Sequence, residues 1–262
     1  MTTTRHVRLR TVALPVEHGA WGFLLEPALL GLLVAWSGAG VALVVAALAA
    51  LLLQTPLSLA LGDIRRGRRY PRTRLAGRVA LLYAFVLVVA LVAAIASAGT
   101  LAIVVPALLA VPLALTQLRF DAYGRARELL PETAGALAMN ALAACIAVAA
   151  GWGLVPALGL WALLAARTVP TIVYVRSRLR LERGHEVATA WVWITHLAAV
   201  MGVAIAVALA DLAWFALVPF AVLTARAALG VSRSRVTVAA KVIGFRELGF
   251  GVATTVLLAL AL

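Results

Sequence analysis

The sequence predicts an all-α fold, a polytopic membrane helical bundle of about nine transmembrane helices. Of the 262 residues, 65% are hydrophobic and 13% are charged, whereas soluble domains carry about 25% charged residues. Residues 79–118 contain no charged side chain, and this run is long enough for two spans of about 20 residues each. The runs are apolar on every face, which excludes the alternating strands of a membrane β-barrel.

Charged and glycine-rich clusters divide the chain into nine apolar runs. Each run is long enough to cross a bilayer as a helix, and each ends at such a cluster. We therefore expect helices over residues 16–37, 41–61, 77–98, 101–118, 133–151, 154–175, 188–210, 212–229 and 238–262.

The first and last runs both carry charged residues. The first follows a basic segment, as a secretory signal does, but it contains Glu17 and Glu26 and lacks a clear cleavage site. We therefore expect an uncleaved first span. The last contains Arg246 and Glu247 near its inner end, where long side chains can snorkel or face a cavity. Eight spans followed by a re-entrant end are the alternative.

The connections between the runs alternate in charge, which predicts the topology. One set is short and contains no Lys or Arg: residues 37–40, 98–100, 151–153 and the turn at Asp211. The other set is long and basic: residues 62–76, 119–132, 176–187 and 230–237. Basic connections stay inside, so we expect a multi-pass protein of the cytoplasmic membrane with its N-terminus in the cytoplasm and its C-terminus outside.

The chain shows a weak internal repeat. Two helical hairpins are followed by an Arg-dense segment at residues 62–69, and the arrangement recurs at residues 176–184. This predicts a single membrane domain, residues 1–262, of two four-helix halves and a final helix, and such repeats often place a site at their interface. The parts are a basic segment (1–15), the halves (16–132 and 133–237) and the final helix (238–262).

The formal charge of +13 does not indicate nucleic-acid binding. Of the 23 basic residues 22 are Arg, and their placement follows the predicted topology. The one cysteine, Cys145, lies in an apolar run, so we interpret it as a packing residue. No cluster of Cys, His and carboxylates has metal-ligand spacing, so we expect no zinc or haem site.

Strongly polar side chains inside the apolar runs are costly and therefore suggest a function. At a rise of about 1.5 Å per residue, Glu26, Gln54 and Arg167 all fall in the predicted cytoplasmic half. With further polar residues they predict a cavity open to the cytoplasm. Those residues are Asn140, His196, Arg226, Arg246 and Glu247.

Arg167 has two interpretations. Its planar guanidinium matches phosphate oxygens, which predicts an anionic ligand. Alternatively, it pairs with Glu26 or Glu247 and fixes helix packing. The loop arginines have a simpler explanation as well, since orientation and anionic headgroups account for basic loops without a site. We expect His196 to be hydrogen-bonded within the bundle rather than to bind a ligand.

His18 stands at the start of the first span, in the run Glu17-His18-Gly19-Ala20-Trp21. An acid and an imidazole beside a glycine, which allows close backbone approach, can form a catalytic or ligand contact. Alternatively, Glu17 complements the positive end of the helix and Trp21 belongs to the aromatic belt. Only His18 then lacks a structural explanation.

Three segments resemble the YwiC-like family of bacterial membrane proteins. They are Pro15-Val16-Glu17-His18-Gly19-Ala20-Trp21, Gly62-Asp63-Ile64-Arg65-Arg66-Gly67 and Tyr174-Val175-Arg176-Ser177-Arg178-Leu179-Arg180. The resemblance runs along nearly the whole chain. It implies a fold and a localisation more than an activity.

The layout more distantly resembles the UbiA superfamily of intramembrane prenyltransferases, in which loops after the second and sixth helices bind a prenyl diphosphate through magnesium. Asp63 and the run Tyr70-Pro71-Arg72-Thr73-Arg74 follow the second predicted span, and the segment 176–184 follows the sixth. Of the expected acids only Asp63, Glu182 and Glu186 remain, and arginine stands where metal-binding carboxylates are needed. A diphosphate leaving group normally needs such metals, so magnesium at Asp63 is possible but disfavoured.

The resemblance implies a protein that binds or converts an isoprenoid-type or other amphiphile with a phosphate or carboxylate head. An enzyme of this kind is a prenyl or related transferase, with Glu26 or His18 as acid or base and Arg167 stabilising charge. The predicted substrate-binding residues are Arg65, Arg66, Arg68, Arg69, Arg176, Arg178, Arg180, Asp63, Gln54, Asn140, Arg246 and Glu247.

Two other functions stay open. A membrane transporter or exporter fits the repeat and the polar residues inside the spans, although the outer half shows no polar path. A non-catalytic structural subunit needs the charges only for orientation. We expect no cofactor, and as partners the bilayer and an amphiphile; the sequence indicates no oligomeric state.

Overall fold

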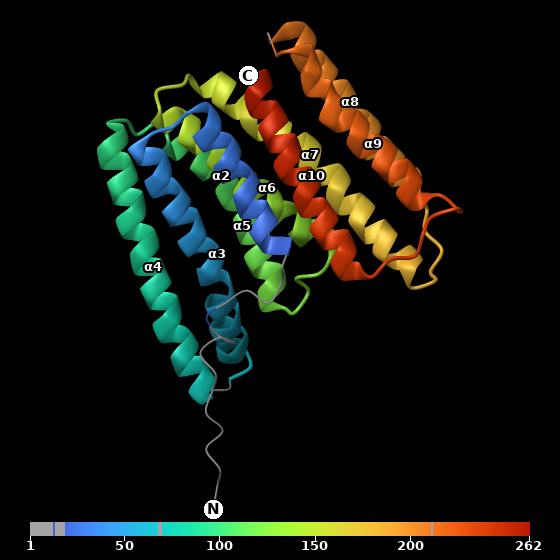
Figure 1. Cartoon of the computed structure of the whole chain (residues 1–262). Coiled ribbons are helices and arrows are strands. Elements are labelled where there is room, and N and C mark those ends of the chain that lie inside the picture. The colour runs from blue at the N-terminus through green and yellow to red at the C-terminus, as the bar shows by residue number, and fades with distance from the viewer. Residues whose placement is uncertain (1–12, 14–18, 68–69, 211) are drawn as a thin grey trace, which may run out of the picture.

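The computed structural model describes residue 13 and residues 19–67, 70–210 and 212–262. Within these residues the chain is all-helical, and its helices form one bundle (Figure 1). In chain order they are α2 (Gly19–Val34), α3 (Gly38–Arg65), α4 (Pro71–Ala98), α5 (Val104–Ala122), α6 (Leu129–Ala149), α7 (Leu154–Glu182), α8 (Ala190–Leu209), the 3₁₀ turn η1 (Trp214–Ala216), α9 (Leu217–Val231) and α10 (Ala240–Ala261).

The helices have the lengths of membrane spans. Eight are long and apolar enough to cross a membrane, counting η1 together with α9, while α2 is shorter with 16 residues. The final run forms the 22-residue helix α10, so it is a full-length candidate span rather than a re-entrant end. The prediction of a multi-pass α-helical membrane protein is confirmed.

Two helices extend into segments that were predicted as loops. α3 continues to Arg65 and α7 to Glu182, with 28 and 29 residues. The predicted loop over residues 176–187 is therefore wrong in its first part. Arginine is a good helix former, and basic residues in a last turn are favoured by the negative helix end. At about 1.5 Å per residue both helices exceed a hydrocarbon core of about 30 Å.

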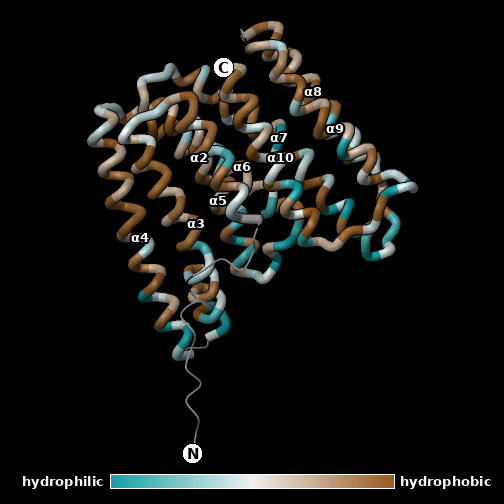
Figure 2. Tube along the Cα trace, in the orientation of Figure 1, coloured by the Kyte–Doolittle hydropathy of each residue, from teal (hydrophilic) through white to brown (hydrophobic). Residues whose placement is uncertain are grey.

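The helices alternate in direction, so their connections gather at two opposite ends of the bundle (Figure 1). We name the basic end the one where α3 meets α4, α5 meets α6, α7 meets α8 and α9 meets α10. Figure 2 shows hydrophilic residues gathered toward this end and hydrophobic residues along the rest of the helices. The predicted alternation of basic and non-basic connections is confirmed. That the basic end faces the cytoplasm stays a prediction.

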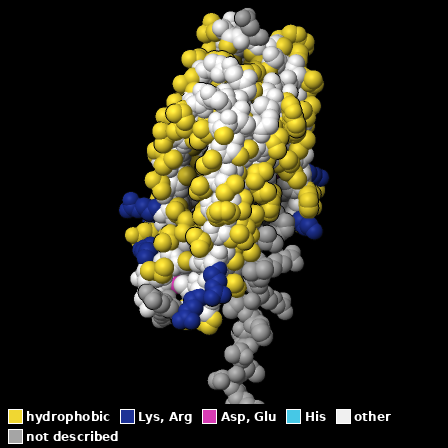
Figure 3. Space-filling model, turned by 90° about the vertical axis from the view of Figure 1, so that its left-hand side faces the viewer, with side chains coloured by type: hydrophobic (Ala, Val, Ile, Leu, Met, Phe, Trp, Pro, Cys, Tyr) yellow, Lys and Arg dark blue, Asp and Glu magenta, His cyan; other side chains and the backbone are white. Residues whose placement is uncertain are grey.

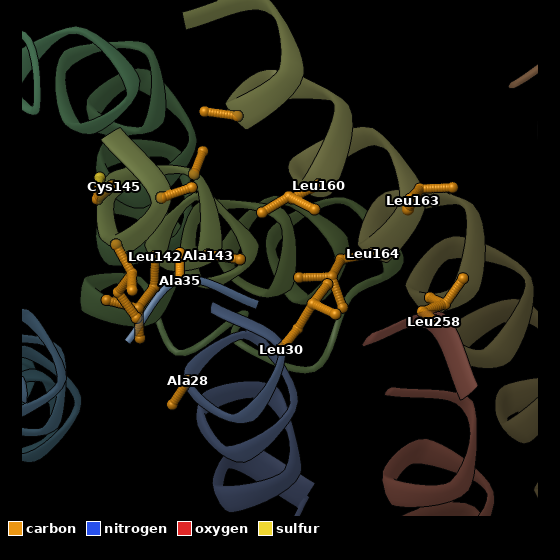
Figure 4. Close-up of a cluster of buried hydrophobic side chains, with 14 of the residues drawn as sticks. Ala28, Leu30, Ala35, Leu142, Ala143, Cys145, Leu160, Leu163, Leu164 and Leu258 are labelled. Atoms are coloured by element: carbon orange, nitrogen blue, oxygen red, sulfur yellow. The ribbon is translucent and has the colours of Figure 1, made fainter. Parts of the chain in front are cut away.

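The core is built around α6, which packs against α2, α3, α5 and α7. Every residue of α6 from Asn140 to Ala149 is buried, and six of these ten are Ala or Cys. Small residues allow helix backbones to approach closely in membranes. Figure 4 shows Leu30 of α2 and Leu164 of α7 meeting in this core, with Leu258 of α10 nearby.

Two helical hairpins flank the core, α3 with α4 on one side and α8 with α9 on the other (Figure 1). The flanking helices keep large apolar side chains exposed, among them Leu81 and Phe85 on α4, and α5 does the same with Leu108. Figure 3 shows the side of the molecule where α4 lies covered by hydrophobic side chains, with Lys and Arg in its lower half, toward the basic end. In a bilayer such a face contacts lipid.

Candidate functional site

The residues predicted for the loops and those predicted inside the spans lie mainly in two separate groups. One lines an open pocket of about 170 Å³ at the basic end. The other forms a buried ionic chain between α2, α7, α8, α9 and α10. The pocket, named the basic-end pocket, is lined by Ser58, Leu59, Gly62, Asp63, Arg66, Arg72, Asp121, Ala122 and Gly124. The chain, named the inner network, comprises Glu26, Arg167, His196, Arg226 and Glu247.

Asp63 holds α3 to the start of α4 in the basic-end pocket. Its Oδ1 accepts a hydrogen bond from Nη2 of Arg72 at 3.0 Å, and its Oδ2 accepts from Nε of Arg72 at 3.3 Å. Oδ2 also accepts from the Thr73 hydroxyl at 2.7 Å. Pro71 at the first helical position and a capping box between Tyr70 and Thr73 start α4 at this point. The carboxylate is 3% exposed although it lies at the end of the bundle.

α5 closes the other side of the pocket. Gln54 of α3 donates a hydrogen bond from Nε2 to Oδ2 of Asp121 at 2.5 Å. Nη1 of Arg65 donates to the carbonyl of Ala122 at 3.2 Å, and its guanidinium lies 3.6 Å from the centre of the Tyr123 ring. Gln54 and Arg65 therefore join helices rather than stand ready for a ligand.

Arg66 and Arg72 are the cations of the pocket with donors to spare. Arg66 is exposed, and within the described part of the chain it makes no side-chain hydrogen bond and no ion pair. Arg72 donates from Nε and Nη2 to the two carboxylate oxygens of Asp63. Both N–H groups of its Nη1 point away from Asp63. An anion entering the pocket meets these groups.

The inner network starts with a buried ion pair. Nη2 of Arg167 lies 3.0 Å from Oε1 of Glu26 and donates to the carbonyl of Glu247 at 3.1 Å. Glu26 is 3% exposed and Arg167 is 2% exposed. The pairing of Arg167 with Glu26 predicted as the alternative is confirmed. Gly251 of α10 makes room for it, because a Cβ there would lie 2.1 Å from Oε1 of Glu26.

Arg226 continues the network to α8. Its Nη1 pairs with Oε2 of Glu247, and its guanidinium lies 4.1 Å from the centre of the Tyr174 ring. Nη2 of Arg226 is 3.4 Å from Nε2 of His196, whose Nδ1 is 2.7 Å from the carbonyl of Val192. This geometry fits a neutral His196 that donates from Nδ1 and accepts at Nε2. His196 is thus hydrogen-bonded within the bundle, as predicted.

The second Arg-dense segment, at the end of α7, is tied to the protein. Arg178 is 4% exposed, donates to the carbonyls of Gly230 and Val236, and pairs with Glu182 at 2.6 Å. Arg176 pairs with Glu132 of α6 at 2.6 Å. Arg180, by contrast, is exposed.

The remaining predicted residues lie apart from both groups or outside the described residues. Asn140 donates to the Thr168 hydroxyl at 2.9 Å inside the core, and Arg246 is exposed on α10. His18, Arg68 and Arg69 lie outside the described residues.

Arg72, Thr73 and Asp121 were not among the predicted site residues. The signal for the first two was local, since Pro71 at a helix start places both in the first turn of α4, the helix that follows α3. Asp121 carried no such signal. Within the described chain no group of three or more His, Cys, Asp or Glu side chains comes together as a metal site.

Comparison with known proteins gives one match. The model of the YwiC-like protein family matches residues 14–147, which is about half of the chain and includes α2 to α5 and most of α6. No curated protein and no solved structure matches the chain.

Proposed function

The chain belongs to the YwiC-like family, and from that premise we propose that it binds an amphiphile with a phosphate or carboxylate head at the basic-end pocket. Arg66 and Arg72 hold the head, and the tail lies along the apolar surfaces of α3, α4 and α5. In this proposal the basic end faces the cytoplasm, in accordance with the positive-inside rule.

The observation that supports the proposal most directly is the pair of guanidinium groups in the pocket. Among the described residues the Arg66 side chain has no hydrogen-bond or ion-pair partner, and Arg72 keeps Nη1 while Asp63 holds its Nε and Nη2. Guanidinium groups bind phosphate and carboxylate oxygens through short, charge-assisted hydrogen bonds. An anionic head therefore finds two cationic donors in one open pocket.

The charge around the pocket also favours an anion. The sequence segments 62–78 and 119–128, which flank it, contain ten arginines and three acidic residues. A surplus of this size raises the local concentration of anions, an effect that salt weakens. Orientation in the membrane explains such a surplus in part, whereas it does not explain an open pocket lined by Arg66 and Arg72.

The surroundings suit an amphiphile better than a free anion. Leu59 lines the pocket, and the helices that form it expose apolar side chains toward the bilayer. A head held at the basic end can thus keep its tail in the membrane (Figure 3). Burial of each CH₂ group of a tail contributes about 0.8 kcal/mol.

An isoprenoid-type tail follows from the resemblance to the UbiA superfamily, which binds prenyl diphosphates after its second helix, where α3 ends in this chain. Conversion of the ligand, with Glu26 or His18 as acid or base and Arg167 stabilising charge, stays a prediction. Glu26 and Arg167 are buried against one another, so a substrate reaches them only if α2, α7 and α10 separate.

The test is a binding measurement on the purified chain in an uncharged detergent, with farnesyl phosphate as the probe. Farnesol and inorganic phosphate serve as comparison ligands for the tail alone and the head alone. We expect farnesyl phosphate to bind more tightly than either. Arg66→Ala is expected to weaken its binding about 10- to 100-fold, which corresponds to a lost charged hydrogen bond.

Arg233→Ala is the matched control. Arg233 is exposed in the connection between α9 and α10 at the same end of the bundle, so this variant removes one charge without touching the pocket. Equal weakening by both variants would reduce the effect to net charge and contradict the proposed site.

A transporter or exporter is the second candidate function, and the inner network favours it. This ionic chain crosses five helices, and Nε of Arg167 has no hydrogen-bond partner among the described residues. Buried charges of this kind mark ion and proton routes in transporters. Proton or anion uptake into vesicles that stops on Glu26→Gln, with farnesyl phosphate binding absent, would favour this alternative.

A further inference from the structure

We infer that the basic-end pocket binds its anionic head without a divalent cation, and that Asp63 positions Arg72 instead of holding a metal. This inference rests on the proposed function and defines the ligand further. It predicts a head of one phosphomonoester or one carboxylate rather than a magnesium–diphosphate complex.

The lone pairs of Asp63 are largely in use. Three hydrogen bonds reach its two oxygens, two from Arg72 and one from Thr73, and a carboxylate offers about four acceptor sites. A magnesium ion at Asp63 would have to displace the Arg72 guanidinium or lie beside it, where the two positive charges repel each other. The carboxylate is also 3% exposed, which leaves little room for the water molecules that magnesium usually keeps.

No second carboxylate of the pocket compensates for this. Asp121 is engaged through Oδ2 by Gln54 at 2.5 Å, and no cluster of three acidic or imidazole ligands exists within the described chain. Magnesium in phosphate sites is held by carboxylates together with the phosphate oxygens. The donors present therefore do not fit the ion that the UbiA resemblance implies.

The same contacts give Asp63 a different role. Its two oxygens hold the Nε–Nη2 edge of Arg72, while Thr73 fixes the carboxylate and, through the capping box, the start of α4. The guanidinium is thereby held in one orientation, with Nη1 left for a ligand. A preorganised donor binds more tightly because less side-chain freedom is lost.

Two arginine side chains suit a single head better than a diphosphate. A phosphomonoester carries about −1.5 to −2 at pH 7; Arg66 supplies one full positive charge, while the charge of Arg72 is shared with Asp63. A diphosphate carries more charge, and arginine alone replaces its usual metals less completely. The pocket thus favours farnesyl phosphate over farnesyl diphosphate as a metal-free ligand.

The experiment measures farnesyl phosphate binding to the full chain in excess EDTA and in millimolar MgCl₂. We expect the two dissociation constants to agree within about twofold. Binding that appears only with MgCl₂ overturns the inference and leaves the proposed function intact. Absence of binding under both conditions overturns the proposed function and the inference together.

A double-mutant cycle in EDTA tests the positioning role of Asp63. In the otherwise unaltered chain, Asp63→Asn is expected to weaken farnesyl phosphate binding about tenfold, which is equivalent to about 1.4 kcal/mol. In a chain that already carries Arg72→Met, Asp63→Asn is expected to weaken binding no further. A full effect of Asp63→Asn without Arg72 would show that Asp63 acts by another route and overturn this role. Cys145 is the only cysteine and is buried, so a thiol dye labels it only when the protein unfolds. A variant whose Cys145 is labelled only on heating is therefore folded.

Discussion

α3 and α7 occupy equivalent places in the predicted repeat, yet their basic ends differ. Both are long, with 28 and 29 residues, both contain an internal proline, Pro56 and Pro170, and both end in an Arg-dense segment. At the end of α7 Arg178 is buried and tied to other parts of the chain, whereas at the end of α3 Arg66 is exposed beside a pocket. One end is a structural clamp and the other a candidate site.

The difference comes from what surrounds each end. The end of α9 and the connection that follows it reach α7, where the carbonyls of Gly230 and Val236 accept from Arg178. Gly230 permits this approach because a Cβ there would lie 2.2 Å from the Tyr174 hydroxyl. At α3 the corresponding partner is α5, which engages Arg65 but not Arg66. An arginine-rich run therefore acquires its role from the neighbouring segment.

The largest effect should come from breaking the clamp. Arg178→Ala removes two hydrogen bonds to carbonyls and leaves Glu182 buried without its partner, so we expect a loss of about 4 kcal/mol of stability. Arg180→Ala, two residues along and exposed, is expected to cost less than about 0.5 kcal/mol. The temperature at which Cys145 becomes reactive to a thiol dye measures both. Equal unfolding temperatures for Arg178→Ala and Arg180→Ala would contradict the structural role assigned to Arg178.

The inner network ties α7, but not α3, to the core by charge. Glu26→Gln or Arg167→Met alone leaves the other charge buried, and each is expected to cost about 3 kcal/mol. The double variant is expected to cost less than the sum of the two, because no unpaired charge remains. Chemical unfolding in detergent of the unaltered chain, the two single variants and the double variant measures these losses. Additive losses would mean that the pair is not a unit.

A smaller effect is expected where α10 approaches the ion pair. Gly251→Ala places a Cβ 2.1 Å from Oε1 of Glu26 and 2.6 Å from Nη2 of Arg167, so we expect a loss of about 2 kcal/mol through overpacking. Gly249→Ala on the same helix meets nothing within 4 Å and serves as the control, neutral or slightly stabilising. A Gly251→Ala protein as stable as the control would contradict the close packing of α10 on the pair.

The smallest of these effects is expected on α3. Gln54 lies shortly before Pro56, much as Arg167 lies shortly before Pro170, but it is neutral, and its one side-chain hydrogen bond among the described residues is to Asp121. Gln54→Ala is expected to cost about 1 kcal/mol, measured by the same dye assay. A loss as large as that of Arg167→Met would show that α3 is held by its polar contact as firmly as α7.

The sequence predicts the helices and their alternation because both follow from runs of apolar residues and from the placement of arginine. It also identifies Glu26 and Arg167 as a possible pair, since buried charges need partners. The helix ends are less predictable: the Arg-dense segments are polar enough for loops, and nothing local shows that α7 continues to Glu182.

The partition of the polar residues into two groups could not be predicted. Arg178 and Gly230 are 52 residues apart and Gln54 and Asp121 are 67 apart, so their contacts depend on how the helices pack. Neighbouring arginines such as Arg176, Arg178 and Arg180 look alike in sequence. In the structure Arg176 is half-buried and ion-paired, Arg178 is buried and Arg180 is exposed.

The most direct test of the two roles is mass spectrometry of the amphiphiles that co-purify with Arg66→Ala and with Arg180→Ala in mild detergent. The variants remove the same charge from exposed positions at the two equivalent helix ends. We predict that Arg180→Ala retains an amphiphile with a phosphate or carboxylate head at the level of the unaltered chain, and that Arg66→Ala loses it. Retention by Arg66→Ala, or loss from Arg180→Ala alone, would contradict the assignment of the site to the end of α3.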